Sequence, residues 1–211
     1  MKTLIINWSF HPLTKQYNMS EDTFIKAVFT QARTYRFFQN KQIDKTTLKQ
    51  LYEVAKFAPS ASNLCPLRIS FVTSEAQKQK VIEAAASGNQ PKIASAPVVV
   101  IVAYDSAFDK YIDTLSPHMN ADSYREQDFA KRQQVAIENS WLQAGVLITA
   151  ARALGLDCGP MSGFNKSEID AAFYSQSSWR SAFLMNLGYG DESKIHPRGN
   201  RLEFDEACEI L

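Results

Sequence analysis

The sequence predicts an α+β domain, and three observations carry this prediction. Patterns typical of helices and of strands follow one another without the regular strand–helix–strand repeat of a doubly wound fold. A continuous apolar, mostly β-branched run over 98–103 predicts a central strand that is buried on both faces. Residues 131–154 carry two apolar stripes at helical spacing, which predicts a long helix buried on most of its sides.

The composition predicts one globular domain over residues 20–211, preceded by an irregular arm at residues 1–19. Of the 211 residues, 45% are apolar and 21% are charged, which is close to ordinary globular usage. The 23 basic and 22 acidic side chains nearly cancel, so no overall field would attract a nucleic acid. No apolar run approaches the roughly 18 residues of a membrane-spanning helix, and the three scattered cysteines suit a reducing cytoplasm. We therefore expect a cytoplasmic protein with neither a nucleic-acid nor a membrane partner.

Two helices are predicted before the first strand. The first covers 21–32, with Ser20 as its N-cap and an acidic pair in its first turn. The second is capped by Asp44 or Thr46, since either side chain can accept a backbone hydrogen bond at a helix start. Its apolar residues recur at helical spacing until Pro59, which is expected to stop the helix.

The segment from 59 to 103 reads as loop, strand, helix and strand. Prolines bound a loop at 59–66, and alternating apolar side chains then predict a strand at 68–73. A helix-like stretch follows at 75–86. The buried run at 98–103 comes next and is the expected middle of the sheet.

The second half of the chain contains the long helix and one further strand. Residues 106–128 mix aromatic and charged side chains with weak periodicity, which indicates a mobile or covering region rather than core. The helix at 131–154 would be closed by Gly155, and its two apolar stripes suggest that a second subunit covers part of it. A short helix capped by Ser167 and a strand at 182–187 follow.

Several common active-site motifs are absent from the sequence. Neither G-x-G-x-x-G nor G-x-x-x-x-G-K-[ST] occurs, so a Rossmann site and a Walker site both lack their phosphate loops. The string from Gly159 to Gly163 places Ser162 one position too late for a nucleophile elbow, which makes a serine hydrolase the weaker alternative. The histidines have no metal-ligand spacing, so no metal is expected.

Two short basic strings could clamp a phosphate. The first is Arg33, Thr34 and Arg36, and the second, near the C-terminus, is Lys194, Arg198 and Arg201. Guanidinium groups match phosphate oxygens with paired hydrogen bonds, and a threonine hydroxyl adds a neutral donor. Taken singly, either string fits a solvated charged surface better.

The order of several motifs along the chain resembles that of the FMN-dependent nitroreductase family. The motifs are, in order, Arg-Thr-x-Arg-x-Phe, APSASN with a nearby proline, Asn-x-x-Lys, ALGLD, GPMSGF and a basic C-terminal string. The likeness extends from about residue 30 to residue 205. Within the family, the segments IVAYDSAFD, NLGYGDESK and EACEIL are most similar to the malonic semialdehyde reductase branch.

The resemblance implies an α+β sandwich in which helices flank a central mixed or antiparallel sheet. It also implies a homodimer whose subunits exchange extended arms and hold two equivalent FMN molecules at their interface. NADH or NADPH would supply a hydride to flavin N5, and a small acceptor would then collect it from the same face in a ping-pong cycle. Because the cofactor carries the chemistry, neither a catalytic side chain nor a metal is implied.

The resemblance also assigns cofactor contacts residue by residue. Around the phosphate and the pyrimidine edge of the ring, these are Arg33, Thr34, Arg36, Asn89, Lys92, Arg198 and Arg201. At flavin N5, the backbone of a turn would face the ring, and its residues are Pro160, Met161, Ser162 and Gly163. The second subunit would contribute a loop and one helix residue, namely Pro59, Ser60, Ser62, Asn63 and Asn139.

The acceptor implied by the resemblance is 3-oxopropanoate (malonic semialdehyde), which would be reduced to 3-hydroxypropanoate. Its carboxylate needs a cation and its aldehyde a proton donor. His118, Tyr124 and Arg125 are candidates for these roles, with ordinary surface residues of a loop as the alternative. Two alternatives for the function stay open: a broad reductase of nitroaromatics or quinones, and a flavin-binding protein without significant turnover. Trp141 is expected in the core rather than stacked on flavin.

Overall fold

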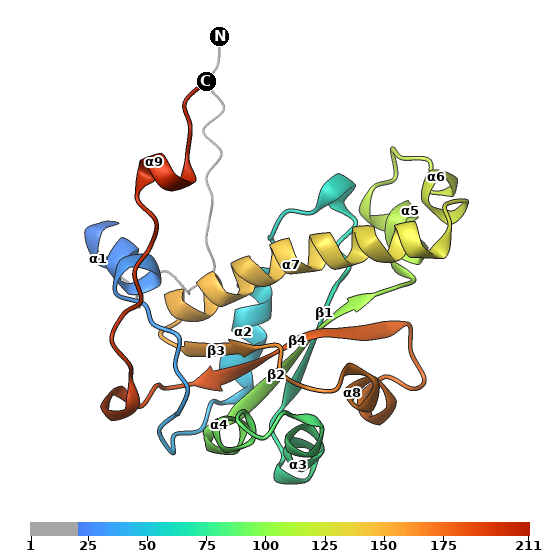
Figure 1. Cartoon of the computed structure of the whole chain (residues 1–211). Coiled ribbons are helices and arrows are strands. Elements are labelled where there is room, and N and C mark those ends of the chain that lie inside the picture. Colours follow the sequence, from blue (N-terminus) through green and yellow to red (C-terminus); the bar gives the residue numbers. More distant parts are fainter. Residues whose placement is uncertain (1–20) are drawn as a thin grey trace.

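The computed structural model describes residues 21–211, and its centre is a four-stranded sheet (Figure 1). The strands are β1 (Leu67–Val72), β2 (Val98–Asp105), β3 (Asp157–Met161) and β4 (Trp179–Gly188). Their order across the sheet is β1-β2-β4-β3, and every neighbouring pair is antiparallel. The predicted α+β class and the antiparallel form of the sheet are therefore confirmed.

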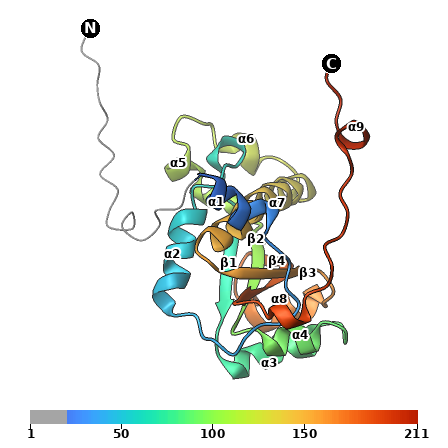
Figure 2. The ribbon, with the colours of Figure 1, turned by 90° about the vertical axis from the view of Figure 1, so that its left-hand side faces the viewer.

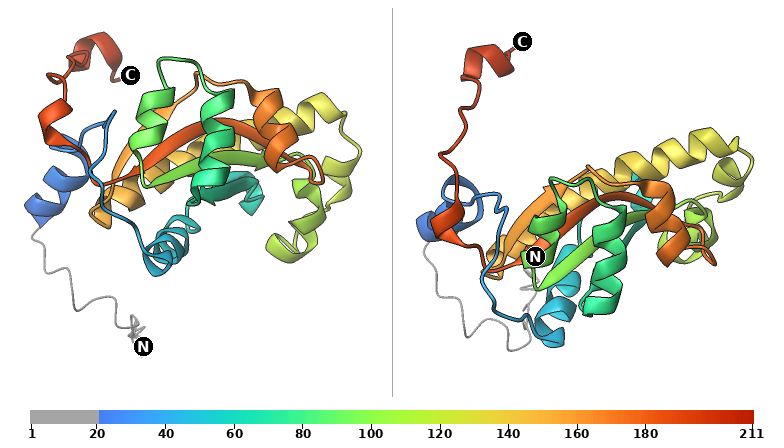
Figure 3. Two further views of the ribbon diagram at one scale, coloured as in Figure 1. Left: turned by 90° about the horizontal axis from the view of Figure 1, so that it is seen from below. Right: turned by 60° about the horizontal axis from the view of Figure 1, so that its bottom comes forward.

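Helices cover both faces of the sheet (Figures 1 and 3). α2 (Lys45–Ala55) and α7 (Phe129–Ala153) lie on one face, and α3 (Glu75–Ala84), α4 (Gln90–Ser95) and α8 (Lys166–Phe173) lie on the other. β2 contributes to both layers because alternate side chains of a strand point to opposite faces. Val100 and Val102 belong to the core under α7, whereas Val99 and Ile101 belong to the core on the other face. The predicted central strand, buried on both faces, is confirmed.

The remaining elements are short. They are α1 (Glu21–Ile25), a π-helical turn (Lys26–Thr30), 3-10 turns at Ala61–Asn63, Phe108–Tyr111 and Glu192–Lys194, and the helices α5 (Ile112–Leu115), α6 (Asp122–Arg125) and α9 (Phe204–Ala207). The C-terminal segment that carries α9 runs away from the layered body (Figure 2). The expected arm at residues 1–19 and the expected cap Ser20 lie outside the described residues.

The second predicted helix begins as expected and ends earlier than expected. Asp44 is its cap, because its carboxylate accepts a hydrogen bond from the Thr47 backbone N–H at 2.7 Å. This bond holds the pKa of Asp44 below its usual value. α2 ends at Ala55 rather than at Pro59. A proline disfavours helical backbone at the residue before it, so the chain leaves the helix in the intervening turn.

The C-terminal end of α7 forms as predicted. Gly155 has a φ of 74°, in the left-handed region that favours glycine. The N–H group of Leu156 donates to the Ala151 carbonyl at 2.9 Å, and this is the bond of a Schellman cap that spans more residues. The cap satisfies carbonyls that the end of the helix would otherwise leave without a partner.

One flank of α7 is exposed in the single chain. Trp141 and Leu142 are 50% and 53% exposed in the single chain. The Trp141 ring stacks on Phe183, with ring centroids 4.6 Å apart, and leaves its other side uncovered. The expectation that Trp141 lies in the core is therefore wrong for one chain, and a broad apolar face stays open.

Two elements that contain a proline differ from the sequence prediction. Residues 157–161 form the edge strand β3, whereas Pro160 to Gly163 are predicted to be a turn. A proline fits an edge strand because it removes no ladder hydrogen bond that a neighbour needs. The helix α4 is not predicted at all, although Pro91 in its first turn is a typical start signal.

Two further predictions in the second half need correction. Asn165 caps α8, since its side chain accepts from the backbone N–H groups of Ser167 and Glu168, so Ser167 is not the cap. The 106–128 segment is more than a cover, because Phe108 and Ile112 are fully buried in the core under α7. Its weak periodicity arises from three short helical turns in place of one regular helix.

The thiol of Cys158 is expected to be unreactive in the folded protein. Cys158 lies on β3 and is 1% exposed, and burial raises the pKa of its thiol to about 12. Only the thiolate reacts with alkylating agents, so iodoacetamide at about pH 8 should label Cys158 only after unfolding. Peptide mass spectrometry measures this, with the exposed Cys208 as internal reference. Equal labelling rates at both cysteines in the folded protein would contradict the expectation.

Candidate cofactor site

A strongly basic pocket of about 320 Å³ lies where residues 29–36 meet the C-terminal segment 194–201. Its lining contains six cationic side chains: Arg33, Arg36, Arg152, Lys194, Arg198 and Arg201. Thr34 adds a hydroxyl, and no carboxylate lines the pocket within the described part of the chain. Cations at this density repel one another unless an anion lies among them, so the basic pocket suits a phosphate group.

The first basic string runs along the outer edge of β3. Thr34 forms a parallel bridge with Cys158, and the Tyr35 N–H donates to the Cys158 carbonyl at 3.0 Å. Gly159 permits this close approach, because a Cβ there would come within 2.3 Å of the Tyr35 carbonyl oxygen. Strand pairing thus fixes the backbone from which the Arg33 and Arg36 side chains extend.

Contacts between the two basic strings close the pocket. The Arg198 guanidinium donates to the Ala32 carbonyl at 2.8 Å, and the Arg33 guanidinium donates to the His196 carbonyl. Arg201 also lines the pocket, but its guanidinium donates only to nearby carbonyls of its own segment. Two strings separated by about 160 residues in sequence therefore lie together.

Two lining residues were not identified from the sequence. Arg152 reaches the pocket from the last turn of α7, where an arginine is also favoured by the helix dipole, so nothing in the sequence marks it as a ligand. In the sequence, the spacing of His196 from the other histidines argues only against a metal site. The His196 Nε2 lies 2.8 Å from a guanidinium nitrogen of Arg36. Because a guanidinium can only donate, Nε2 is the acceptor in this contact.

A second group of predicted residues lies just beyond the end of β3. The Asn89 side-chain amide donates to the Gly163 carbonyl at 3.0 Å, and the Lys92 ammonium donates to the Asn89 carbonyl oxygen at 2.9 Å. A Cβ at position 163 would come within 2.7 Å of the Asn89 side-chain amide nitrogen, so a larger residue there would displace the Asn89 side chain. A cation and an amide are thereby fixed beside a stretch of uncovered backbone.

Pro160 and Met161 connect this group to the basic pocket. They lie in β3 rather than in the predicted turn, and only Ser162 and Gly163 follow the strand. One edge strand thus carries the basic pocket along its outer side and the Lys92–Asn89–Gly163 cluster at its end. We call this arrangement the first half-site.

The remaining predicted residues gather at the opposite edge of the sheet, in a second half-site. The Ala61 N–H donates to the Asn139 side-chain oxygen at 2.6 Å, which ties the loop 59–66 to α7. The loop leads into β1, and β1 and β3 are the two outer strands. Three strand spacings of about 4.8 Å separate them, or roughly 14 Å. Within one chain, the predicted contacts therefore form two half-sites and not one site.

The local contacts of the second half-site include the remaining loop residues. The Asn63 amide donates to the Leu115 carbonyl at 2.8 Å, and the Ser60 hydroxyl accepts from the Cys65 N–H at 3.0 Å. The Ser62 carbonyl accepts from a hydroxyl of the 106–128 segment. Pro59 is exposed at the start of the loop.

The acceptor candidates in the 106–128 segment are largely occupied. The Arg125 guanidinium lies 2.8 Å from Asp113 and 3.3 Å from Asp122, so its charge is already compensated. The Tyr124 ring packs edge-on against Phe108. Among residues 21–211, no group of three acidic, cysteine or histidine side chains forms a metal site, and no helix there has the length and apolarity to cross a bilayer.

The fold is an antiparallel α+β sandwich, and a basic pocket of a kind that suits an anionic ligand lies along one edge strand. The chain matches the family model described as Nitroreductase family over residues 29–189. It is 44% identical over 191 residues to a Ralstonia nicotianae protein provisionally named NADH dehydrogenase/NAD(P)H nitroreductase, covering 90% of this chain and 98% of that protein. The chain therefore belongs to the nitroreductase family and is an oxidoreductase of that family.

Solved structures show the same fold. A nitroreductase structure from Bacillus subtilis has a TM-score of 0.78 at 22% identity and covers 89% of this chain and 98% of its own. A nitroreductase from Exiguobacterium sibiricum, solved in complex with FMN, has a TM-score of 0.77 at 21% identity and covers 89% and 97%. At such identities the likeness establishes the fold alone.

Proposed function

We propose that the protein is an FMN-dependent NAD(P)H oxidoreductase. The observation that carries the proposal is the basic pocket, which lies along the same edge strand that leads to the Lys92–Asn89–Gly163 cluster. FMN carries a phosphate at one end and a flavin ring at the other, so its two ends match the two parts of the first half-site. The Ralstonia relative is named for NAD(P)H and the Exiguobacterium structure holds FMN, which supports the proposal.

Different residues of the first half-site bind different parts of this cofactor. When bound, FMN supplies at N5 the atom that accepts and donates hydride. The arginines of the basic pocket bind the phosphate through charge-assisted hydrogen bonds. The Lys92 ammonium, fixed by Asn89, stabilises negative charge on the pyrimidine side of the ring. Gly163 lets the backbone approach the ring where a side chain would keep it away.

The two half-sites support a homodimer. A second copy would bring loop 59–66 of one chain to the first half-site of the other. Apolar side chains are available for such an interface, since Phe57 is 81% exposed and Trp141 and Leu142 are half exposed in the single chain. The extended C-terminal segment, with exposed Leu202 and Phe204, would be the exchanged arm.

The acceptor in this proposal is 3-oxopropanoate, reduced to 3-hydroxypropanoate, and its support is the motif resemblance in IVAYDSAFD, NLGYGDESK and EACEIL. A second candidate class is nitroaromatics or quinones. An apolar pocket of about 310 Å³ beside Asn63 favours it, and its apolar lining is Tyr52, Phe57, Leu67, Ile69 and Leu115. A flat aromatic acceptor would fit such a lining better than a small carboxylate.

Purification and turnover test the proposal together. We expect yellow protein that releases FMN on denaturation, elutes as a dimer, and is bleached by NADH or NADPH without oxygen. Steady-state kcat/KM for 3-oxopropanoate, 4-nitrobenzoate and benzoquinone then separates the acceptor classes. A colourless dimer that does not take up FMN would refute the cofactor proposal, and bound FMN that NAD(P)H does not reduce would indicate a flavin-binding protein without turnover. Ser162→Ala should leave kcat nearly unchanged, whereas a serine hydrolase would lose its activity.

A further inference from the structure

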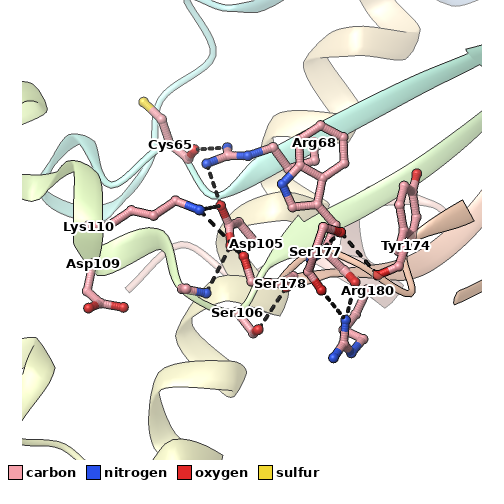
Figure 4. Close-up of polar contacts among 12 residues, drawn as sticks. Cys65, Arg68, Asp105, Ser106, Asp109, Lys110, Tyr174, Ser177, Ser178 and Arg180 are labelled. Atoms are coloured by element: carbon pink, nitrogen blue, oxygen red, sulfur yellow. Dashed lines mark hydrogen bonds and ion pairs between the residues drawn. The ribbon is translucent and has the colours of Figure 1, made fainter.

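A buried carboxylate outside the first half-site is the hub of a polar network (Figure 4). Asp105, at the end of β2, is fully buried; its Oδ2 accepts from the Arg68 guanidinium at 2.9 Å and lies 3.2 Å from the Lys110 ammonium. Its Oδ1 accepts from the Ser178 hydroxyl and, at 2.9 Å, from the Ala107 N–H. Burial alone would raise the pKa of Asp105, but these bonds outweigh it, so the pKa lies below its usual value.

Arg68 connects the hub to loop 59–66. Its Nη1 donates to the Cys65 carbonyl at 2.9 Å, while its Nη2 is held by the buried carboxylate. The guanidinium lies over two aromatic rings, 5.1 Å from the centroid of Tyr111 and 5.8 Å from that of Trp179. The Arg68 side chain is only 15% exposed. It is therefore a fixed point from which the end of the loop is held.

The loop needs to be held because its backbone is strained. Ser62, Asn63 and Cys65 have φ values of 48°, 54° and 43°. Left-handed backbone is unfavourable for any residue with a Cβ. Residues in such conformations persist where their surroundings over-determine them, and they concentrate at functional sites.

The same hub anchors the segment that covers the loop. Asp105 binds the start of this segment through the Ala107 N–H and the Lys110 ammonium. Further along, the Leu115 carbonyl accepts from the Asn63 amide, and the Ser116 hydroxyl donates to the Ser62 carbonyl. Asp105 thus fixes both Arg68 and the 106–128 segment, and each of these contacts the strained loop.

We propose that Arg68, fixed by Asp105, is a positioning residue for the loop that faces the cofactor. The inference rests on the proposed function, in which this loop of one chain lies against the flavin held by the other. Arg68 acts through the Cys65 carbonyl of the second half-site, and it does not line the basic pocket of the first half-site. A displacement of about 1 Å at a reacting centre can cost roughly 100-fold in rate, so the hold on the loop bears on turnover.

Arg68→Lys is the variant that tests the proposal. Lysine keeps the charge beside Asp105 but lacks the planar fork that reaches the loop carbonyl at the same time. We expect amide hydrogen exchange at residues 61–65 to become about tenfold faster, in the apo protein as well. In the holoenzyme we expect kcat to fall about 10- to 100-fold. FMN affinity should fall much less than kcat, because the basic pocket that binds the phosphate is remote from the change.

A second substitution separates positioning from simple destabilisation. Glycine adopts left-handed backbone without the cost of a Cβ, so Cys65→Gly added to Arg68→Lys should restore most of kcat. Asp109→Asn is the matched control. Asp109 pairs with Arg132 of α7 at 3.4 Å, which fastens the same covering segment without touching the loop. It should leave kcat and the amide exchange of residues 61–65 unchanged.

Each combination of results either supports or overturns the positioning role of Arg68. Faster loop exchange with lower kcat and rescue by Cys65→Gly supports the proposal. If amide exchange in the loop is unchanged in Arg68→Lys, Arg68 does not restrain the loop. If exchange is faster but kcat is unchanged, the restraint does not affect turnover, and the positioning role is overturned. An equal loss of kcat in Asp109→Asn, without rescue by Cys65→Gly, reduces Arg68 to a stabilising residue and also overturns it. A wild-type protein without flavin refutes the proposed function instead, while loop exchange still decides on Arg68.

Discussion

Replacing Arg33 by alanine is expected to weaken FMN binding roughly 10- to 150-fold, since a hydrogen bond to a charged group contributes about 1.5–3 kcal/mol. Arg33 lines the basic pocket and also donates to the His196 carbonyl, so its loss removes a cation and loosens the second basic string. Both effects lower the affinity for a phosphate. Titration of apo protein with FMN, followed by flavin fluorescence, measures the dissociation constant.

Two further variants show whether the effect arises from the guanidinium. Arg33→Lys keeps the charge but not the fork, so it should fall between wild type and Arg33→Ala. Arg125→Ala removes an arginine that is paired with Asp113 and Asp122 outside the first half-site, and it should leave FMN affinity unchanged. Equal affinities of wild type and Arg33→Ala would remove the basic pocket from the cofactor site.

The fold was predictable where one local pattern decides the structure. The apolar run at 98–103 favours a strand that is buried on both faces, and this strand lies inside the sheet. Gly155 supplies the left-handed φ that ends α7. Gly159 and Pro160 indicate a turn and not a strand, because both residues usually interrupt strands. Their strand exists because residues 157–161 pair with β4, and Thr34 forms a bridge on the other side, neither of which a local pattern reveals.

The candidate site was predictable in its parts but not in its assembly. Asn89 and Lys92 are three residues apart, so one helical turn brings them together, and their spacing is visible in the sequence. Arg152 and His196 join the basic pocket only through tertiary packing, and neither stands in a motif. The division into two half-sites follows from the strand order, which places β1 and β3 at opposite edges.

Gly159→Ala is expected to destabilise the protein by about 3 kcal/mol, through overpacking of a buried position. The added Cβ would come within 2.3 Å of the Tyr35 carbonyl oxygen, which is backbone and cannot rotate away. Residues 33–36 would have to separate from β3, and the arginines of the basic pocket would move with them. Thermal unfolding should shift down by about 6–12 °C for a chain of this size.

Loss of FMN should accompany this loss of stability, because one backbone contact serves both. Gly88→Ala is the control, since a Cβ there has no atom within 4 Å and its φ lies outside the left-handed region. It should change the melting temperature by less than about 2 °C. If Gly159→Ala bound FMN as wild type does, the pairing of residues 33–36 with β3 would not be what places the phosphate-binding arginines. A folded Gly159→Ala variant with full stability would mean that this edge of the sheet is looser than the contact between Gly159 and Tyr35 implies.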